Sequence, residues 1–168
     1  MPRPLILEDT IARPADTTTY AAGDVISEVT TNDFFTFTPA TDKAAKPGYI
    51  DYASIVINAN STLKPDLELW IFDTTIAEVA DNSAFAPTDA EILTLVGIIE
   101  FPASLFKVGL SGSGASGNIA QTVVGVGIPF ETKAASGANL FGQLVVRNAY
   151  VPIASETFKV RLGVVHEG

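Results

Sequence analysis

The sequence predicts an all-β protein built as a two-sheet sandwich, with one short helix and an extended N-terminal arm. Apolar and polar residues alternate with a period of two in several segments, which is typical of half-buried strands. Glycine and proline, 13 and 10 of the 168 residues, separate these segments at short intervals. Only one stretch carries a convincing start signal for a helix. The length suits a single domain that buries a full core.

The first fifteen residues are expected to form an extended arm, and residues 16–168 a single β-sandwich domain. Pro2, Pro4 and Pro14 restrict the backbone of this segment to extended conformations. Between them lies a short apolar group, Leu5-Ile6-Leu7. We therefore expect the arm to lie on the body of the protein or on a neighbouring molecule, outside the core.

Nine segments read as strands: 24–29, 35–38, 49–58, 66–72, 96–101, 105–110, 119–130, 140–150 and 156–165. The last shows the clearest alternation, because Phe158, Val160, Leu162 and Val164 are separated by Lys159, Arg161 and Gly163. Loops are predicted at 31–33 and, from its Pro-Gly pair, at 43–48.

The segment 66–72 is predicted to be covered on both faces. Leu67, Leu69 and Ile71 share one face, which suits a core. Trp70 and Phe72 lie on the opposite face, and two large aromatic side chains there indicate that a second surface packs against them.

The one helix is expected near residues 88–96. Thr88 and Glu91 have the spacing of a capping box, in which each side chain bonds the backbone amide of the other residue. Gly97 is expected to end the helix within two or three turns. Many short strands, frequent turns and one short helix together favour a jelly-roll-like sandwich.

Composition limits the classes of partner and chemistry. The net charge of −9 argues against binding nucleic acid or an anionic membrane surface. Only 17% of the residues are charged, so part of the surface is apolar, as in proteins that assemble into larger structures. The chain has no cysteine and one histidine, His166, which removes the usual nucleophiles, proton carriers and zinc ligands. No catalytic residue, cofactor or metal is expected.

The sequence contains one match to a nucleotide-binding motif and no match to the serine-hydrolase motif G-x-S-x-G. Residues 112–117 match G-x-G-x-x-G, but a strand-like segment follows where a dinucleotide-binding helix should begin. We interpret them as a flexible loop between strands. A serine hydrolase would also need a histidine partner for its serine. The one histidine, His166, lies in the C-terminal tail, and we interpret it as an ordinary terminal polar residue.

Acidic residues offer two weaker candidates. Asp66 with Glu68, and Asp89 with Glu91, are candidate carboxylate pairs, but solvated strand faces and a helix start explain these acids without chemistry. A calcium ion would find oxygen ligands in one loop-rich stretch, at Asp73, Glu78, Asp81, Asn82 and Asp89. Their spacing is not that of an EF-hand, and turn chemistry at 81–83 is the simpler interpretation.

A sugar-binding platform is a further alternative, built on the aromatic residues Trp70, Tyr20, Tyr49, Tyr52 and Tyr150. A single tryptophan within an apolar strand belongs more often to a core or a subunit interface.

Three blocks of sequence carry a resemblance to a known family of proteins. The first is Arg13-Pro-Ala-Asp-Thr-Thr-Thr-Tyr-Ala-Ala-Gly-Asp24. The second comprises Leu67-Glu-Leu-Trp-Ile-Phe72, Ala80-Asp-Asn-Ser-Ala-Phe85 and Val96-Gly-Ile-Ile-Glu-Phe101. The third is Asn139-Leu-Phe-Gly-Gln-Leu-Val-Val146, with Pro152 and the strand from Phe158 to Leu162.

These blocks resemble a family of small virion proteins of tailed bacteriophages. The resemblance implies a capsid decoration (cement) protein or another minor head protein of a double-stranded DNA phage. Such a protein is made in the bacterial cytoplasm and, as a homotrimer, binds the major capsid protein on the outside of the virion at capsomer junctions. The arm is expected to add a strand to a neighbour's sheet. Residues expected at the contact are Pro2, Pro4, Leu5, Ile6, Leu7, Ile11, Trp70 and Phe72. The alternatives are a tail or fibre module and a carbohydrate-binding sandwich for host adsorption.

Overall fold

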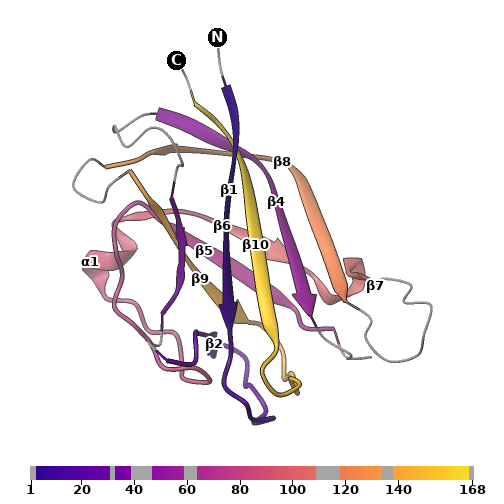
Figure 1. Ribbon diagram of the computed structural model, residues 1–168. Coiled ribbons are helices and arrows are strands. Elements are labelled where there is room, and N and C mark those ends of the chain that lie inside the picture. The colour runs from indigo at the N-terminus through magenta and orange to yellow at the C-terminus, as the bar shows by residue number, and fades with distance from the viewer. Residues whose placement is uncertain are drawn as a thin grey trace.

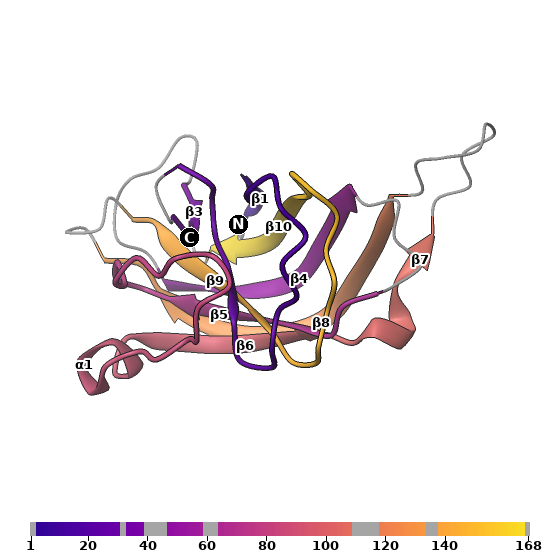
Figure 2. The same cartoon turned by 90° about the horizontal axis from the view of Figure 1, so that it is seen from below.

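The computed structural model describes residues 3–30, 33–38, 47–58, 64–108, 118–133 and 138–166. Two antiparallel sheets pack face to face, and their strands cross at an angle (Figures 1 and 2). The first sheet has the order β1 (Arg3–Ala12), β10 (Thr157–His166), β4 (Pro47–Asn58), β8 (Ile119–Glu131) and β7 (Lys107–Val108). The second has the order β2 (Val25–Ile26), β9 (Leu140–Val146), β5 (Leu67–Phe72) and β6 (Leu95–Phe101), and β3 (Phe35–Phe37) also pairs with β9.

The order of the strands is that of a jelly roll. The first strand pairs with the last, β1 with β10, and the next strands, β2 and β3, pair with β9 in the opposite sheet. The chain passes from one sheet to the other between β1 and β2, β3 and β4, β4 and β5, β6 and β7, and again from β8 to β9 to β10. This double-hairpin winding confirms the predicted all-β, two-sheet, jelly-roll-like sandwich.

The core lies between the sheets and follows from the alternation in the sequence. In β10 the side chains of Phe158, Val160, Leu162 and Val164 are all fully buried, while Arg161 between them is exposed. From the opposite sheet, β5 contributes its predicted core face, Leu67, Leu69 and Ile71, to the same cluster. Each such side chain adds roughly 1.5–3 kcal/mol through burial, so these two strands are central to stability.

The N-terminal segment is extended, as predicted, but it is an integral strand of the sandwich. β1 pairs with β10 along its whole length, from Arg3 opposite His166 to Ala12 opposite Thr157. Leu7 and Ile11 are buried in the main core, although we expected them on the outside. Proline at the start of a strand costs nothing when its nitrogen faces away from the paired neighbour. The prolines therefore determined the extended conformation and did not exclude the segment from the core.

A bulge bends the first sheet. In the pairing of β4 with β8, Ile50 lies opposite Ile128 and Tyr52 opposite Val124, so Asp51 faces three residues, 125–127. Gly125 and Gly127 have φ values of 67° and 62°, a left-handed conformation that glycine adopts without strain. Figure 1 shows β8 turning sharply in its upper part. A bulge of this kind bends and twists the strand that contains it.

The predicted capping box is present, but the helix is a single turn. In α1 (Asp89–Ile92) the Thr88 hydroxyl accepts from the Glu91 amide, and the Glu91 carboxylate accepts from the Thr88 amide. The helix stops before the predicted end at 96, and Gly97 lies within β6. Its role is close packing, because a Cβ atom on Gly97 would lie 2.9 Å from the side chain of Ile128 on β8.

Several strand boundaries differ from those predicted. The segment 24–29 shortens to β2, since the Ser27 amide donates to the Asp81 carboxylate and its hydroxyl to the Val79 carbonyl, at 3.0 and 2.7 Å. The segment 105–110 is divided between a 3₁₀ turn (Ala103–Leu105) and β7, and its last two residues lie outside the described part. Pro47 and Gly48, predicted as loop, begin β4. Residues 31–32, 43–46 and 112–117 also lie outside the described residues.

Candidate binding surface

The residues of β1 that were expected to contact a partner differ in how far they are exposed to solvent. Ile6 is 63% exposed on the outer face of the first sheet, and Leu5 is half-buried. Leu7 and Ile11 are turned into the core and are no more than 4% exposed. Pro4 lies in β1, and Pro2 lies outside the described residues. Ile6 therefore offers the large apolar surface of this strand to a partner.

The second face of β5 is covered by the chain itself, as the sequence predicted. Phe72, fully buried, forms a small second cluster with Phe34, Ile76 and Phe141, against which Trp70 packs. The Trp70 ring also meets Phe85 edge to face, with ring centres 5.4 Å apart. Phe72 therefore leaves no surface for a partner to touch, and Trp70 leaves only part of its ring.

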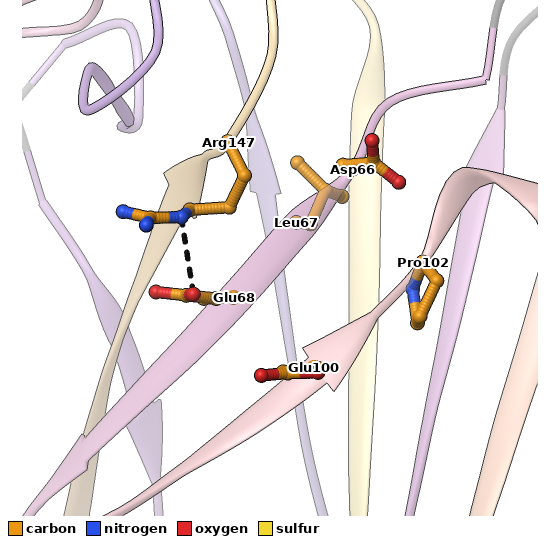
Figure 3. Close-up of a pocket in the computed structure, with 6 residues that line it drawn as sticks. All are labelled: Asp66, Leu67, Glu68, Glu100, Pro102 and Arg147. Atoms are coloured by element: carbon orange, nitrogen blue, oxygen red, sulfur yellow. Dashed lines mark ion pairs between the residues drawn. The ribbon is translucent and has the colours of Figure 1, made fainter.

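A polar pocket of about 260 Å³ lies on the outer side of the second sheet (Figure 3). Glu68 on β5 accepts from the indole of Trp70 at 2.9 Å and pairs with Arg147 at 3.1 Å. Glu100 on β6 lies directly opposite Glu68 in the strand register. Arg147 thus offsets the repulsion between two facing carboxylates.

Asp66 and Glu68, considered in the sequence as a carboxylate pair, are each bound to other groups of the chain. The Asp66 carboxylate accepts from the backbone amide of Ala103 and holds the turn after β6 against β5. Glu68 is committed to Trp70 and Arg147. These are structural contacts within the sheet.

An apolar groove of about 410 Å³ lies beside this pocket, and Glu100 and Pro102 line both. One wall is β6, with Ile98 and Ile99 next to Glu100. The other wall is the inner side of β8, including Gln121 and Val123. Leu105, in the 3₁₀ turn, lines the groove and is 54% exposed. The pocket and the groove together form a continuous candidate surface, polar on the sheet face and apolar at the sheet edge.

A buried polar cluster joins three loops at the end of the sandwich farthest from the termini. The Arg13 guanidinium has no exposed side-chain surface, and its Nε donates to the Tyr20 hydroxyl at 2.8 Å. That hydroxyl donates to Asp81 at 2.7 Å. Arg13 also donates to the carboxylate of Asp16 at 2.9 Å and to the Ile153 carbonyl at 3.1 Å. Burial, followed by the bond to Asp81, raises the pKa of Tyr20.

A second buried pair adjoins this cluster. The Tyr150 hydroxyl lies 2.6 and 2.7 Å from the two carboxylate oxygens of Glu156, which has no exposed surface. Burial raises the pKa of Glu156 to about 7, and the hydrogen bond from Tyr150 offsets part of the rise. Burial and the nearby carboxylate raise the pKa of Tyr150 as well. Tyr20 and Tyr150 stack with ring centres 6.2 Å apart, which joins the two groups.

The sequence did not reveal this cluster, because its members are far apart along the chain and follow no periodic pattern. The one signal is that Arg13, Asp16 and Tyr20 all fall within the first block of the resemblance. Tyr20 and Tyr150 are buried, so neither offers a ring face to a sugar. The five aromatic residues considered for a sugar platform therefore do not form one exposed surface.

Two of the five residues considered for calcium bind other groups of the chain. Asp73 forms an ion pair with Lys133 at 2.9 Å, and Asp81 accepts a hydrogen bond from the Tyr20 hydroxyl in the Arg13 cluster. Within the described part of the chain, no group of three or more His, Cys, Asp or Glu residues could hold a metal ion. His166 ends β10 opposite Arg3. None of the helices in the described ranges is long and apolar enough to cross a bilayer.

Comparisons with known proteins found similarity only at the level of structure. No family model matches the sequence, and no curated protein matches it. A chain from a structure of Nora virus is 16% identical, and the match covers 98% of this chain and 57% of that chain at a TM-score of 0.32. A chain of Cocksfoot mottle virus is 12% identical, with 97% and 84% covered and a TM-score of 0.31. Both come from viruses, but TM-scores this low establish neither a common fold nor a common function.

Proposed function

We propose that this chain is a non-enzymatic structural protein of a virion, which decorates and stabilises the outside of a tailed-phage capsid at capsomer junctions as a homotrimer. The observation that carries the proposal is the free outer edge of β1. No described strand pairs with this side of β1, and ten residues lie along it. A strand edge without a paired neighbour is a ready site for strand addition.

The edge is most open near its N-terminal end. Farther along, the Asp9 carboxylate accepts from the Thr36 amide at 2.7 Å, and the Ala12 carbonyl accepts from the Val29 amide at 3.0 Å. Those contacts cover the C-terminal part of β1. The exposed side chain of Ile6 lies in the remaining part, where a partner strand would meet apolar surface.

The sequence resemblance supports the class of assembly. Its blocks fall on the Arg13 cluster, on β5, β6 and β9 of the second sheet, and on β10 of the first sheet. The residues in these blocks stabilise the fold. The resemblance therefore supports a common architecture with that family and identifies no catalytic residue. In the proposed role the major capsid protein is the partner. Many trimers, each bridging capsomers, would add contact area where packaged DNA strains the shell.

The test is binding of the purified, labelled chain to DNA-filled heads and to detached tails of the phage whose genome encodes it. We expect co-sedimentation with heads and protection of the heads against DNA loss on heating. Ile6→Asp should weaken binding at least tenfold. Val124→Asp is the matched control, since Val124 is 77% exposed at the far side of the same sheet. Binding to tails alone would favour a tail module and contradict the proposal.

The trimer is tested separately by size-exclusion chromatography with light scattering. A monomer at micromolar concentration would contradict the proposed trimer without affecting the test of head binding.

A further inference from the structure

The apolar groove beside β6 lies along the edge of that strand. Successive side chains of a strand point to opposite faces of its sheet. Ile98, Ile99 and Glu100 are consecutive, yet all three line the groove. Residues from both faces of β6 therefore line the groove, and β6 is an edge strand of its sheet, which places the groove at that edge. This edge carries no paired strand among the described residues, so alternate backbone N–H and C=O groups of β6 point toward the groove.

The wall of the groove opposite β6 is formed by β8. The sheets approach closely at Gly97 and Ile128, where no side chain larger than hydrogen fits between them. Beyond that point the wall of β8 carries Val123 and Val126. Val126 lies between the two left-handed glycines of the bulge and packs partly buried against the main core. The bulge thus contributes Val126 to the wall of the groove.

Gln121 supplies an observation independent of shape. Its side chain is inward-facing, 5% exposed and lines the groove. Both amide atoms, Oε1 and Nε2, lack any hydrogen-bond partner in the described structure. Buried amide groups are nearly always paired, because an unpaired one loses its bonds to water without replacement. Gln143, the other buried glutamine, has a partner for its nitrogen, which donates to the Ile26 carbonyl at 3.0 Å.

We propose that the groove binds an extended peptide segment of a partner protein, which adds a strand to the free edge of β6 and pairs one of its peptide units with the Gln121 amide. A peptide unit presents one N–H and one C=O, which matches the acceptor and donor of a glutamine side chain. Apolar side chains of the segment pack on Ile98, Val123 and Leu105. The inference does not depend on the virion role.

Charge and polarity select this occupant over others. Glu100 forms the rim, is exposed, and makes no ion pair with the described residues, so a flanking Lys or Arg of the segment would pair with it. A nucleic acid would be repelled by Glu100 and Glu68. A purely apolar small molecule would leave the Gln121 amide unpaired. An extended peptide segment with alternating apolar side chains and one flanking Lys or Arg would match the apolar lining, the Gln121 amide and the Glu100 carboxylate.

The binding test uses a displayed library of random dodecapeptides and the purified chain. We expect enrichment of peptides with alternating apolar residues and a Lys or Arg. Fluorescence anisotropy with the synthesised peptide should show affinity at least tenfold weaker for Gln121→Leu, and no measurable binding for Leu105→Asp. Leu93→Asp is the control, because Leu93 is 87% exposed beside the distant helix α1.

A second readout distinguishes a binding residue from a structural one. In the free chain, Gln121→Leu should raise the melting temperature by about 2–4 °C, since it removes an unpaired buried amide. Gln143→Leu should lower it, because the Ile26 carbonyl then loses its donor. Failure to enrich any peptide, or equal peptide affinity of wild type and Gln121→Leu, would overturn the proposal. Self-association that Leu105→Asp abolishes without peptide would assign the groove to a second copy instead.

Discussion

The Tyr150 hydroxyl lies within hydrogen-bond distance of both carboxylate oxygens of a fully buried Glu156, at 2.6 and 2.7 Å. The pair closes the loop between β9 and β10, and the backbone amide of Arg13 donates to the Glu156 carbonyl at 3.0 Å. Because Glu156 contacts both Tyr150 and Arg13, the stability of this end of the sandwich depends on whether its carboxyl group is protonated.

Stability should fall as pH rises through neutrality. The pKa of Glu156 is about 7 in the folded chain and near 4.5 when unfolded, so the folded state holds its proton more strongly. The stabilisation is fully present below about pH 4.5 and is lost as pH rises through 7. We expect a loss of about 2–3 kcal/mol in unfolding free energy between pH 5 and pH 8. Urea denaturation at both values measures it.

Glu156→Gln is the control for that titration. The amide cannot ionise, so the variant should show a flat profile over the same range. A wild-type chain with equal stability at pH 5 and pH 8 would contradict the assignment. Carboxylates whose pKa is lowered, such as Glu8 and Glu91, act in the acid range and do not mask this window.

Replacing Arg13 should be among the most damaging single substitutions. Arg13→Met removes the donor to the Tyr20 hydroxyl and leaves the Asp81 carboxylate, 7% exposed, without its nearest cation. Breaking a buried pair by removing one partner typically costs about 3–5 kcal/mol. Chemical denaturation should show this loss. Lys159→Met, which removes an exposed ion pair with Glu8, should change stability by less than about 1 kcal/mol.

Neighbouring residues of β1 should respond in opposite ways. Leu7→Asp places a charge in the main core and should destabilise the chain by more than about 3 kcal/mol. Ile6→Asp places the same charge in solvent and should leave the melting temperature nearly unchanged. Thermal unfolding of the two variants compares them. Equal destabilisation by both would contradict the register of β1 on β10.

Gly163 should be intolerant of alanine because of Tyr52. A Cβ atom at Gly163 would overlap the Tyr52 ring, which lies opposite on β4. We expect Gly163→Ala to cost about 1–3 kcal/mol. In a Tyr52→Ser background the same substitution should cost much less, and this coupling is measured by a double-mutant cycle. Additive effects would show that the ring does not constrain the glycine.

Local signals in the sequence predicted most of the strands and the helix start, although several boundaries differed, and tertiary contacts decided the candidate surface. The alternation of Phe158 to Val164 predicted β10, and the spacing of Thr88 and Glu91 predicted the helix start, because both depend on residues a few positions apart. The bond between Arg13 and the Ile153 carbonyl joins residues 140 positions apart, and no periodic pattern encodes it.

The groove was missed for a related reason. Gln121 reads as one polar residue within a strand, and only the sheet order shows that it faces an open edge. The glycines at 125 and 127 were a usable signal, since glycine inside a strand pattern often marks a bulge. The N-terminal strand was misplaced relative to the core because proline fixes the backbone conformation and says nothing about which side chains are buried.

The pairing of Arg3 with His166 brings the start of β1 and the end of β10 to one pole of the molecule, opposite the loop after β1 (Figure 1). A cargo fused to either end would therefore emerge on the same side, so the two fusions are interchangeable for display. The ends can also be joined by a short linker and the chain reopened in a surface loop, giving a circular permutant with unchanged strand pairing. Placing the new ends beside Leu105 would bring any fused peptide next to the groove.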